Sequence, residues 1–334
     1  MARTSDDGRS AGAMIVNNSY EFGNIIADRR LLRAGIFLGQ ILLLAVIVYA
    51  AQGRARQAWQ AIDWRNLSLR LEWIWVAVAL QSGFFVLAAY GWSRTLRATG
   101  SAISAPRAMS ISLMTQPYKY LPGGLGLYVG RSILFLRSDN SPERAVQSTA
   151  IELILMVLTG AVFAAPLALQ NVAQDGSAMA ALALLPVLLI GLRWLQRSRW
   201  AETRPFRQLL QWSGLGHLPL RDLGVLFLLF AARWIVLGAS LMALAEAIGI
   251  SAISLFWPFV SMYALAWTVG FLTPLPGGLG VREVALAALL TPTLPQSALT
   301  LAILARLMWI AGEAITSLGG WLWGLGIARA EANQ

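Results

Sequence analysis

Long apolar stretches recur along the chain and are separated by polar, mostly basic segments. Six of them approach or reach the roughly 20 residues that a helix needs to cross the hydrocarbon of a bilayer. These predicted spans are 34–53, 73–93, 147–169, 177–192, 223–245 and 298–327. An α-helix satisfies its backbone hydrogen bonds within the segment, as lipid requires. The pattern therefore predicts an all-α polytopic membrane protein.

Two further apolar stretches, 108–136 and 255–290, are interrupted by the same six residues. Leu-Pro-Gly-Gly-Leu-Gly occupies 121–126 and again 275–280. Proline lacks an amide donor and restricts the residue before it, and paired glycines adopt backbone conformations that strain other residues. Each stretch is therefore predicted to be a re-entrant hairpin that turns at its motif. The motif residues that matter most are Pro122, Gly123, Gly124, Gly126, Pro276, Gly277, Gly278 and Gly280.

Basic residues gather on the cytoplasmic side of membrane proteins, and their distribution here favours a cytoplasmic N-terminus. The first hairpin then enters from the cytoplasm and the second from outside. Residues 73–169 and 223–327 become two repeats of opposite orientation, joined by the helix at 177–192. Broken helices in corresponding places of two inverted repeats are typical of transporters whose binding site lies at the breaks. An eight-span arrangement, in which both hairpins cross fully, is the alternative.

The rest of the domain organisation follows from this pattern. Residues 1–30 are polar and are predicted to be a disordered cytoplasmic segment. Residues 31–328 form a single transmembrane domain, and 329–334 form a cytoplasmic tail. The sequence does not indicate the oligomeric state.

Composition excludes several kinds of chemistry. Of 334 residues, 57% are hydrophobic and 13% are charged. The chain has no cysteine and one histidine, His217, which excludes disulfides, a histidine metal cluster and a histidine-dependent triad. We therefore expect no metal and no cofactor. The net charge of +10 is explained by basic cytoplasmic loops, so we expect no nucleic acid partner.

Charged residues at membrane depth are the candidate functional groups, because burying a charge there costs about 2.5–3.5 kcal/mol even on the mildest scale. A helix that starts at a motif favours an anion at its free amides, and arginine grips phosphate with a bidentate fork. We therefore hypothesise that three cations bind the phosphate of a lipid and that four other charged residues form a gate or charge network. The phosphate-binding residues are Lys119, Arg131 and Arg282; the network residues are Glu152, Glu283, Arg306 and Glu313.

Structural roles are the alternative for each of these residues. Arg131 and Arg282 would then pair with carboxylates or reach an interface, and Lys119 would extend to the cytoplasmic surface. Arg306 and Glu313 are seven residues apart on one helix, about 10 Å, so each needs a partner other than its neighbour. Arg233, inside the span at 223–245, is a further cation at membrane depth.

The motifs resemble those of a known family. Lys119-Tyr120-Leu121-Pro122-Gly123, Gly130-Arg131 and Glu152 resemble its first signature, and Pro276-Gly277-Gly278-Leu279-Gly280-Val281-Arg282-Glu283, with Arg306 and Glu313, resembles its second. This is the lysylphosphatidylglycerol synthase transmembrane-region family. The resemblance extends over about 30–327. Gly124-Leu125-Gly126 departs from the bulkier segment of many members, which leaves the substrate open.

The resemblance implies a flippase-like module of the bacterial inner membrane. Some relatives continue into a soluble aminoacyl-transferase domain, which we do not expect here because the chain ends at Gln334. We expect a lipid flippase that moves an anionic phospholipid or a polyprenyl-phosphate-linked lipid, and not an enzyme. The alternatives are a membrane-embedded lipid-modifying transferase and a non-transporting partner of a lipid-synthesis enzyme.

Overall fold

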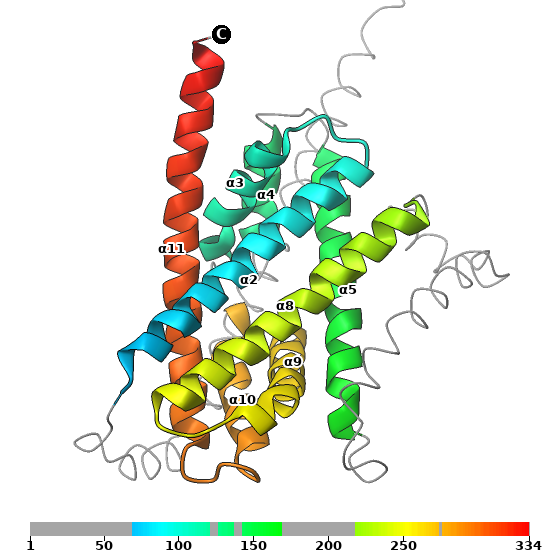
Figure 1. Ribbon diagram of the computed structural model, residues 1–334. Helices are drawn as coiled ribbons and strands as arrows, with labels where there is room; N and C mark the ends of the chain where they lie inside the picture. Colours follow the sequence, from blue (N-terminus) through cyan, green and yellow to red (C-terminus); the bar gives the residue numbers. More distant parts are fainter. Residues whose placement is uncertain (1–68, 121–125, 137–141, 169–217, 274–275, 334) are drawn as a thin grey trace, which may run out of the picture.

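The computed structural model describes residues 69–120, 126–136, 142–168, 218–273 and 276–333. All regular structure in these ranges is helical (Figure 1). The longer helices are α2 (Leu71–Ala98), α5 (Pro142–Ala168), α8 (Leu220–Ala247), α9 (Phe256–Leu272) and α11 (Ala298–Ala332). The shorter elements are α3 (Ala105–Met114), η1 (Gln116–Tyr120), α4 (Gly126–Leu136), η4 (Ile253–Leu255), η5 (Pro276–Gly278) and α10 (Val281–Leu290).

Four of the six predicted spans coincide with α2, α5, α8 and α11. The other two, 34–53 and 177–192, lie outside the described residues, as does the N-terminal segment 1–30. Five helices in the described part are long and apolar enough to cross a membrane. These findings confirm an all-α polytopic membrane protein.

The fifth of these helices differs from the expected pattern. It covers Ile253–Leu272 and was predicted only as the first arm of the second hairpin. Its 20 residues reach about 30 Å, the thickness of the bilayer hydrocarbon. The second arm, α10, has 10 residues, or about 15 Å. The second hairpin is therefore asymmetric, because its motif lies near the end of a full-length helix.

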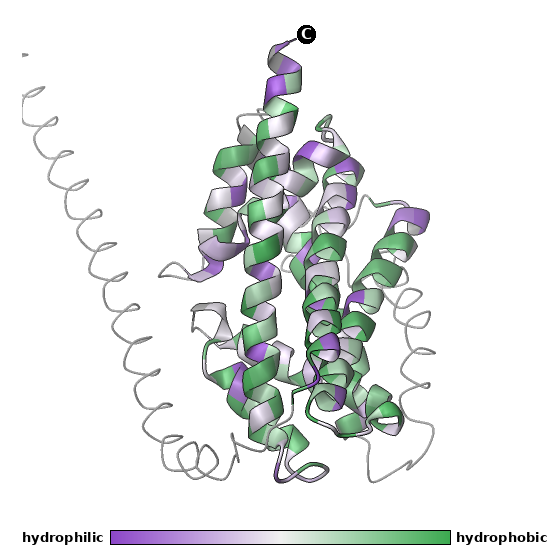
Figure 2. Cartoon of the chain, turned by 60° about the vertical axis from the view of Figure 1, so that its left-hand side comes forward, coloured by the Kyte–Doolittle hydropathy of each residue, from purple (hydrophilic) through white to green (hydrophobic). Residues whose placement is uncertain are grey.

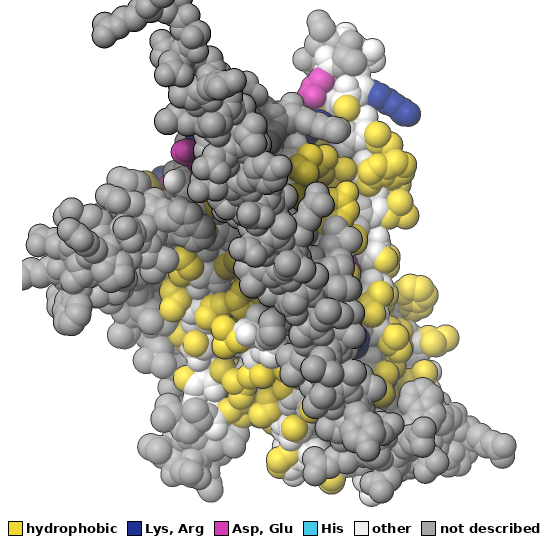
Figure 3. All heavy atoms as spheres, turned by 180° about the vertical axis from the view of Figure 1, so that it is seen from behind, with side chains coloured by type: hydrophobic (Ala, Val, Ile, Leu, Met, Phe, Trp, Pro, Cys, Tyr) yellow, Lys and Arg dark blue, Asp and Glu magenta, His cyan; other side chains and the backbone are white. Residues whose placement is uncertain are grey.

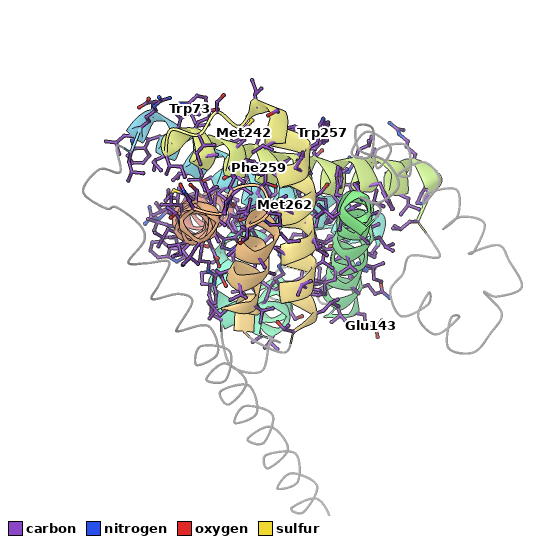
Figure 4. All side chains as sticks on the ribbon, turned by 90° about the horizontal axis from the view of Figure 1, so that it is seen from below. Trp73, Glu143, Met242, Trp257, Phe259 and Met262 are labelled. Atoms are coloured by element: carbon purple, nitrogen blue, oxygen red, sulfur yellow. The ribbon has the colours of Figure 1, made fainter. Side chains whose placement is uncertain are left out.

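Corresponding helices of the two predicted repeats run in opposite directions. In Figure 1, α2 rises and α8 descends beside it, while α5 descends and α11 rises. The last helix of each repeat packs against the first arm of the hairpin in the other repeat: α5 packs against α9, and α11 packs against α3. Figure 4, viewed from below, shows α9 between α10 and α5. This arrangement is the one that an inverted repeat requires.

The two broken segments approach each other from opposite halves of the molecule. The helices α3 and α4 lie in the upper half of Figure 1, and α9 and α10 lie in the lower half. Their tips meet where η1 contacts η5. A side chain at Gly277 would come within 2.8 Å of the Tyr120 ring, so glycine permits this contact. The segment directly before the first motif therefore lies against the second motif.

The outer faces of the helices are apolar. Figure 2 shows hydrophobic residues over most of the long helices, and hydrophobic side chains dominate the uncovered surface in Figure 3. Large side chains such as Leu228, Leu272 and Leu318 are 68%, 70% and 58% exposed. Apolar surface of this extent is suited to lipid. The same helices bury their polar residues toward one another.

Two glycines in α11 allow close packing against α3. Ser110 of α3 donates a hydrogen bond from its hydroxyl to the Gly320 carbonyl oxygen at 2.8 Å. A side chain at Gly324 would also meet the Ser110 hydroxyl, at 2.5 Å. Gly319 and Gly326 face open space instead, so only part of the glycine-rich segment has this role.

Candidate functional site

The second motif forms a tight turn that starts α10. Gly277, Gly278 and Gly280 have φ angles of 61°, 66° and 81°, a region that favours glycine. The Gly280 N–H donates to Glu283 Oε2 at 2.7 Å, which caps the first turn of the helix. This turn directs Arg282 into the interior, where the residue is only 8% exposed to solvent.

The first motif has a matching position. Residues 121–125, including Pro122, Gly123 and Gly124, lie outside the described residues. The helix α4 (Gly126–Leu136) includes the last residue of this motif, Gly126. Lys119 and Tyr120 lie at the end of η1, immediately before the motif.

Arg282 is a buried cation without an acidic partner. Among the described residues, no carboxylate forms an ion pair with its guanidinium, and its Nε has no hydrogen-bond partner. The guanidinium carbon lies 4.3 Å from the centre of the Trp309 ring and 5.7 Å from that of Trp267. Stacking on aromatic rings supports a guanidinium but does not neutralise its charge.

The four neighbouring charges are paired. Arg306 Nε lies 3.2 Å from Glu283 Oε1. Lys119 Nζ lies 2.9 Å from Glu313 Oε2, and the Tyr120 hydroxyl donates to the same oxygen at 2.9 Å. Lys119 therefore does not extend to the surface, and Arg306 and Glu313 have separate partners, as their spacing indicated. The Lys119–Glu313 and Tyr120–Glu313 contacts join the tip of the first hairpin to α11.

A small pocket, with room for about one water molecule, adjoins Arg282. Its lining includes Arg282, Arg306, Trp309 and Tyr263. The Tyr263 hydroxyl accepts a hydrogen bond from Gln81 Nε2 at 3.3 Å. Sequence reasoning did not identify Tyr263 or Trp309, because no local motif marks an aromatic residue that a distant helix brings to a site.

A second set of buried charges surrounds Arg131, which is 1% exposed. Its Nη1 donates to Glu152 Oε2, and its Nη2 donates to the Ser112 hydroxyl at 3.0 Å. Arg233 of α8 lies 3.5 Å from the other oxygen of Glu152. This pairing favours the structural alternative for Arg131, in contrast to Arg282.

Each repeat thus has an ion pair between the second arm of its hairpin and its last helix. Arg131 and Glu152 join α4 to α5, and Glu283 and Arg306 join α10 to α11. Glu152 and Arg306 are separated by the same 154 residues as the two motifs. In the first repeat the hairpin carries the cation and the last helix the carboxylate, whereas in the second repeat the hairpin carries the carboxylate and the last helix the cation. The charges therefore do not follow the symmetry of the backbone.

Both sets of charges have an excess of one cation. We call Lys119, Arg282, Glu283, Arg306 and Glu313 the Arg282 cluster; it holds three cations and two carboxylates. We call Arg131, Glu152 and Arg233 the Arg131 cluster; it holds two cations and one carboxylate. At membrane depth an uncompensated cation attracts an anion strongly, because the surroundings screen it poorly.

Glu152→Gln is expected to destabilise the protein by roughly 3–5 kcal/mol, because it leaves two buried arginines without their shared carboxylate. Thermal unfolding in detergent measures the loss. Glu143→Gln is the matched control, since this residue is exposed in the first turn of the same helix. Equal stability of the two variants would contradict the pairing.

The comparison with protein families agrees with these motifs. The sequence matches the family described as the lysylphosphatidylglycerol synthase TM region over residues 30–310. The chain belongs to this family. The matched part of this lysylphosphatidylglycerol synthase TM region contains both motifs and the Arg131 cluster, and Glu313 lies just beyond it. The family predicted from the motifs is confirmed. The comparison with curated proteins finds no match.

Proposed function

We propose that the protein is a flippase that moves an anionic lipid between the leaflets of the bacterial inner membrane. The lipid is a phospholipid or a polyprenyl-phosphate-linked lipid. Arg282 carries the proposal, because its buried guanidinium has no acidic partner among the described residues and lines a pocket. Family membership supports a role in lipid synthesis or flipping.

The position of Arg282 explains why an anion suits the pocket. It lies in the first turn of α10, where the free amides and the helix dipole already favour negative charge. A second positive charge at this place is stable only with a counter-charge nearby. A lipid phosphate supplies that charge and accepts a bidentate grip from the guanidinium. Arg306, beside Glu283, adds to the positive field of the pocket.

The remaining charges form the contacts that change during transport. Lys119 and Tyr120 hold Glu313, and thereby hold the tip of the first hairpin against α11. In an inverted repeat, each half adopts the conformation of the other as access alternates. Release of this contact on one side and re-formation of an equivalent one on the other would open the site to opposite leaflets. The proposal places the N-terminus in the cytoplasm and both hairpins as re-entrant segments.

Transport by the purified chain in liposomes tests the proposal. Fluorescent phosphatidylglycerol is placed in both leaflets, and a membrane-impermeant quencher reports the pool that becomes accessible from outside. We expect complete quenching with protein and about half without it, since only the outer leaflet is then exposed. Fluorescent phosphatidylcholine is the neutral control and should move more slowly. Inactivity towards anionic lipids would instead favour a non-transporting partner of a lipid-synthesis enzyme.

A further inference from the structure

The Arg131 cluster contains a cation that its carboxylate does not neutralise. Arg131 takes one oxygen of Glu152 in the shorter contact, and Arg233 reaches the other oxygen only at 3.5 Å. The Nε atoms of both arginines are buried without a hydrogen-bond partner. Arg233 is 5% exposed, so water does not replace the missing partner from the surface. Among the residues that the structure describes, one positive charge therefore remains without a counter-charge in this cluster.

The surroundings of Arg233 match those of Arg282. Its guanidinium carbon lies 4.5 Å from the centre of the Phe84 ring and 5.1 Å from that of Phe230. Arg282 is stacked in the same way on Trp309 and Trp267. In both places a buried excess guanidinium rests on aromatic faces and has a free Nε.

The two excess arginines are joined by a pair of rings. Phe84 contacts Trp309, with ring centres 5.0 Å apart and planes inclined at 50°. Arg233 stacks on Phe84, and Arg282 stacks on Trp309. The Phe84–Trp309 pair thus lies between the two cations. It brings the Arg131 cluster and the Arg282 cluster within a few side chains of each other.

We infer that Arg233 forms a second anion subsite beside the Arg131–Glu152 pair, separated from the Arg282 pocket by the Phe84–Trp309 pair. This inference rests on the proposed function, because it places two binding sites along one transport path. Its ligand is a singly charged phosphate group, that of a lipid phosphodiester or of inorganic phosphate. One negative charge balances the excess of this cluster.

The positions of the elements suit a path between leaflets. Arg131 belongs to α4 and Arg282 belongs to α10, and these helices lie in opposite halves of the molecule (Figure 1). A headgroup that passes from one subsite to the other must move the two rings apart. An aromatic pair excludes a solvated ion. The Phe84–Trp309 pair therefore closes the path except while a headgroup moves from one subsite to the other.

Arg233→Gln tests this inference, since it leaves the Arg131–Glu152 pair intact. We expect an unchanged or higher melting temperature, because a buried excess cation has been removed. We also expect a roughly tenfold slower transport of phosphatidylglycerol, because the second anion subsite has lost its cation. Native mass spectrometry in detergent with added phosphatidylglycerol should count one lipid fewer than on the wild type. Arg94→Gln is the control, because Arg94 of α2 pairs at 3.4 Å with Asp222 of α8, the helix that carries Arg233, and belongs to neither cluster.

The outcomes separate the possible ligands and the two proposals. If the lipid count is unchanged but inorganic phosphate raises the melting temperature of the wild type and not of Arg233→Gln, the subsite holds free phosphate. If Arg233→Gln melts lower and transports at the wild-type rate, Arg233 is a structural partner of Glu152 and the subsite does not exist. Failure of the proposed function is seen elsewhere, as wild-type protein that moves no phosphatidylglycerol in liposomes.

Discussion

Arg282→Gln is expected to abolish lipid transport while leaving the protein as stable as the wild type. Substitution of one partner in a buried ion pair lowers stability by about 3–5 kcal/mol, because it strands the other charge. Arg282 has no such partner in the part of the chain that the structure describes. Its removal therefore strands no carboxylate, whereas the lipid phosphate loses its main cation. Thermal unfolding and liposome transport on the same preparations measure both effects.

Two further variants sharpen this prediction. Arg282→Lys should also transport poorly, because an ammonium group lacks the planar fork and stacks less well on Trp309. Arg282→Gln combined with Glu283→Gln should gain nothing over the single change. A single variant that melts early and recovers both stability and transport on neutralisation of Glu283 would refute phosphate binding by Arg282.

Gly278→Leu is expected to cause a large loss of both folded protein and transport. The residue has a φ angle of 66°, and a Cβ atom there would lie 2.8 Å from the Gly270 carbonyl oxygen. Positive φ alone costs a bulky residue on the order of 1–3 kcal/mol, and the obstacle is backbone, which cannot rotate away. Displacement of this turn also moves Arg282, because α10 begins three residues later.

Gly319→Leu is the matched control for this substitution. Gly319 lies inside α11 with nothing within 4 Å of an added Cβ atom, and it faces outward. The control should keep transport and should melt close to the wild type. If Gly278→Leu were expressed, folded and active to the same degree, the second motif would be an ordinary loop with no role in the site.

Much of the fold could be predicted from the sequence, because lipid imposes strong local rules. Apolar length located α2, α5, α8 and α11, since a spanning helix needs a minimum number of residues. Proline and glycine located the break at the second motif, since these residues act on their own backbone. The 154-residue repeat and the basic loops predicted opposed halves, and α2 and α8 do run in opposite directions. The motifs also identified the family.

The partners of the buried charges could not be predicted in this way. The sequence placed Arg131 and Arg282 in equivalent roles, because both follow a motif. The tertiary structure separates them: α5 brings Glu152 to Arg131, whereas no carboxylate of the described residues forms an ion pair with Arg282, and the rings of Trp267 and Trp309 lie over its guanidinium. Similarly, a contact between η1 and α11 decides that Lys119 meets Glu313.

The physical reason is the difference between local and distant interactions. Helix formation, backbone breaks and preference for lipid depend on residues within one or two turns, so a single sequence contains them. The fate of a buried charge depends on which side chain a distant helix brings within about 4 Å, and that choice follows from how whole helices pack. The sequence determined that this protein is an all-α membrane protein; only its packing decided which arginine has no acidic partner among the described residues.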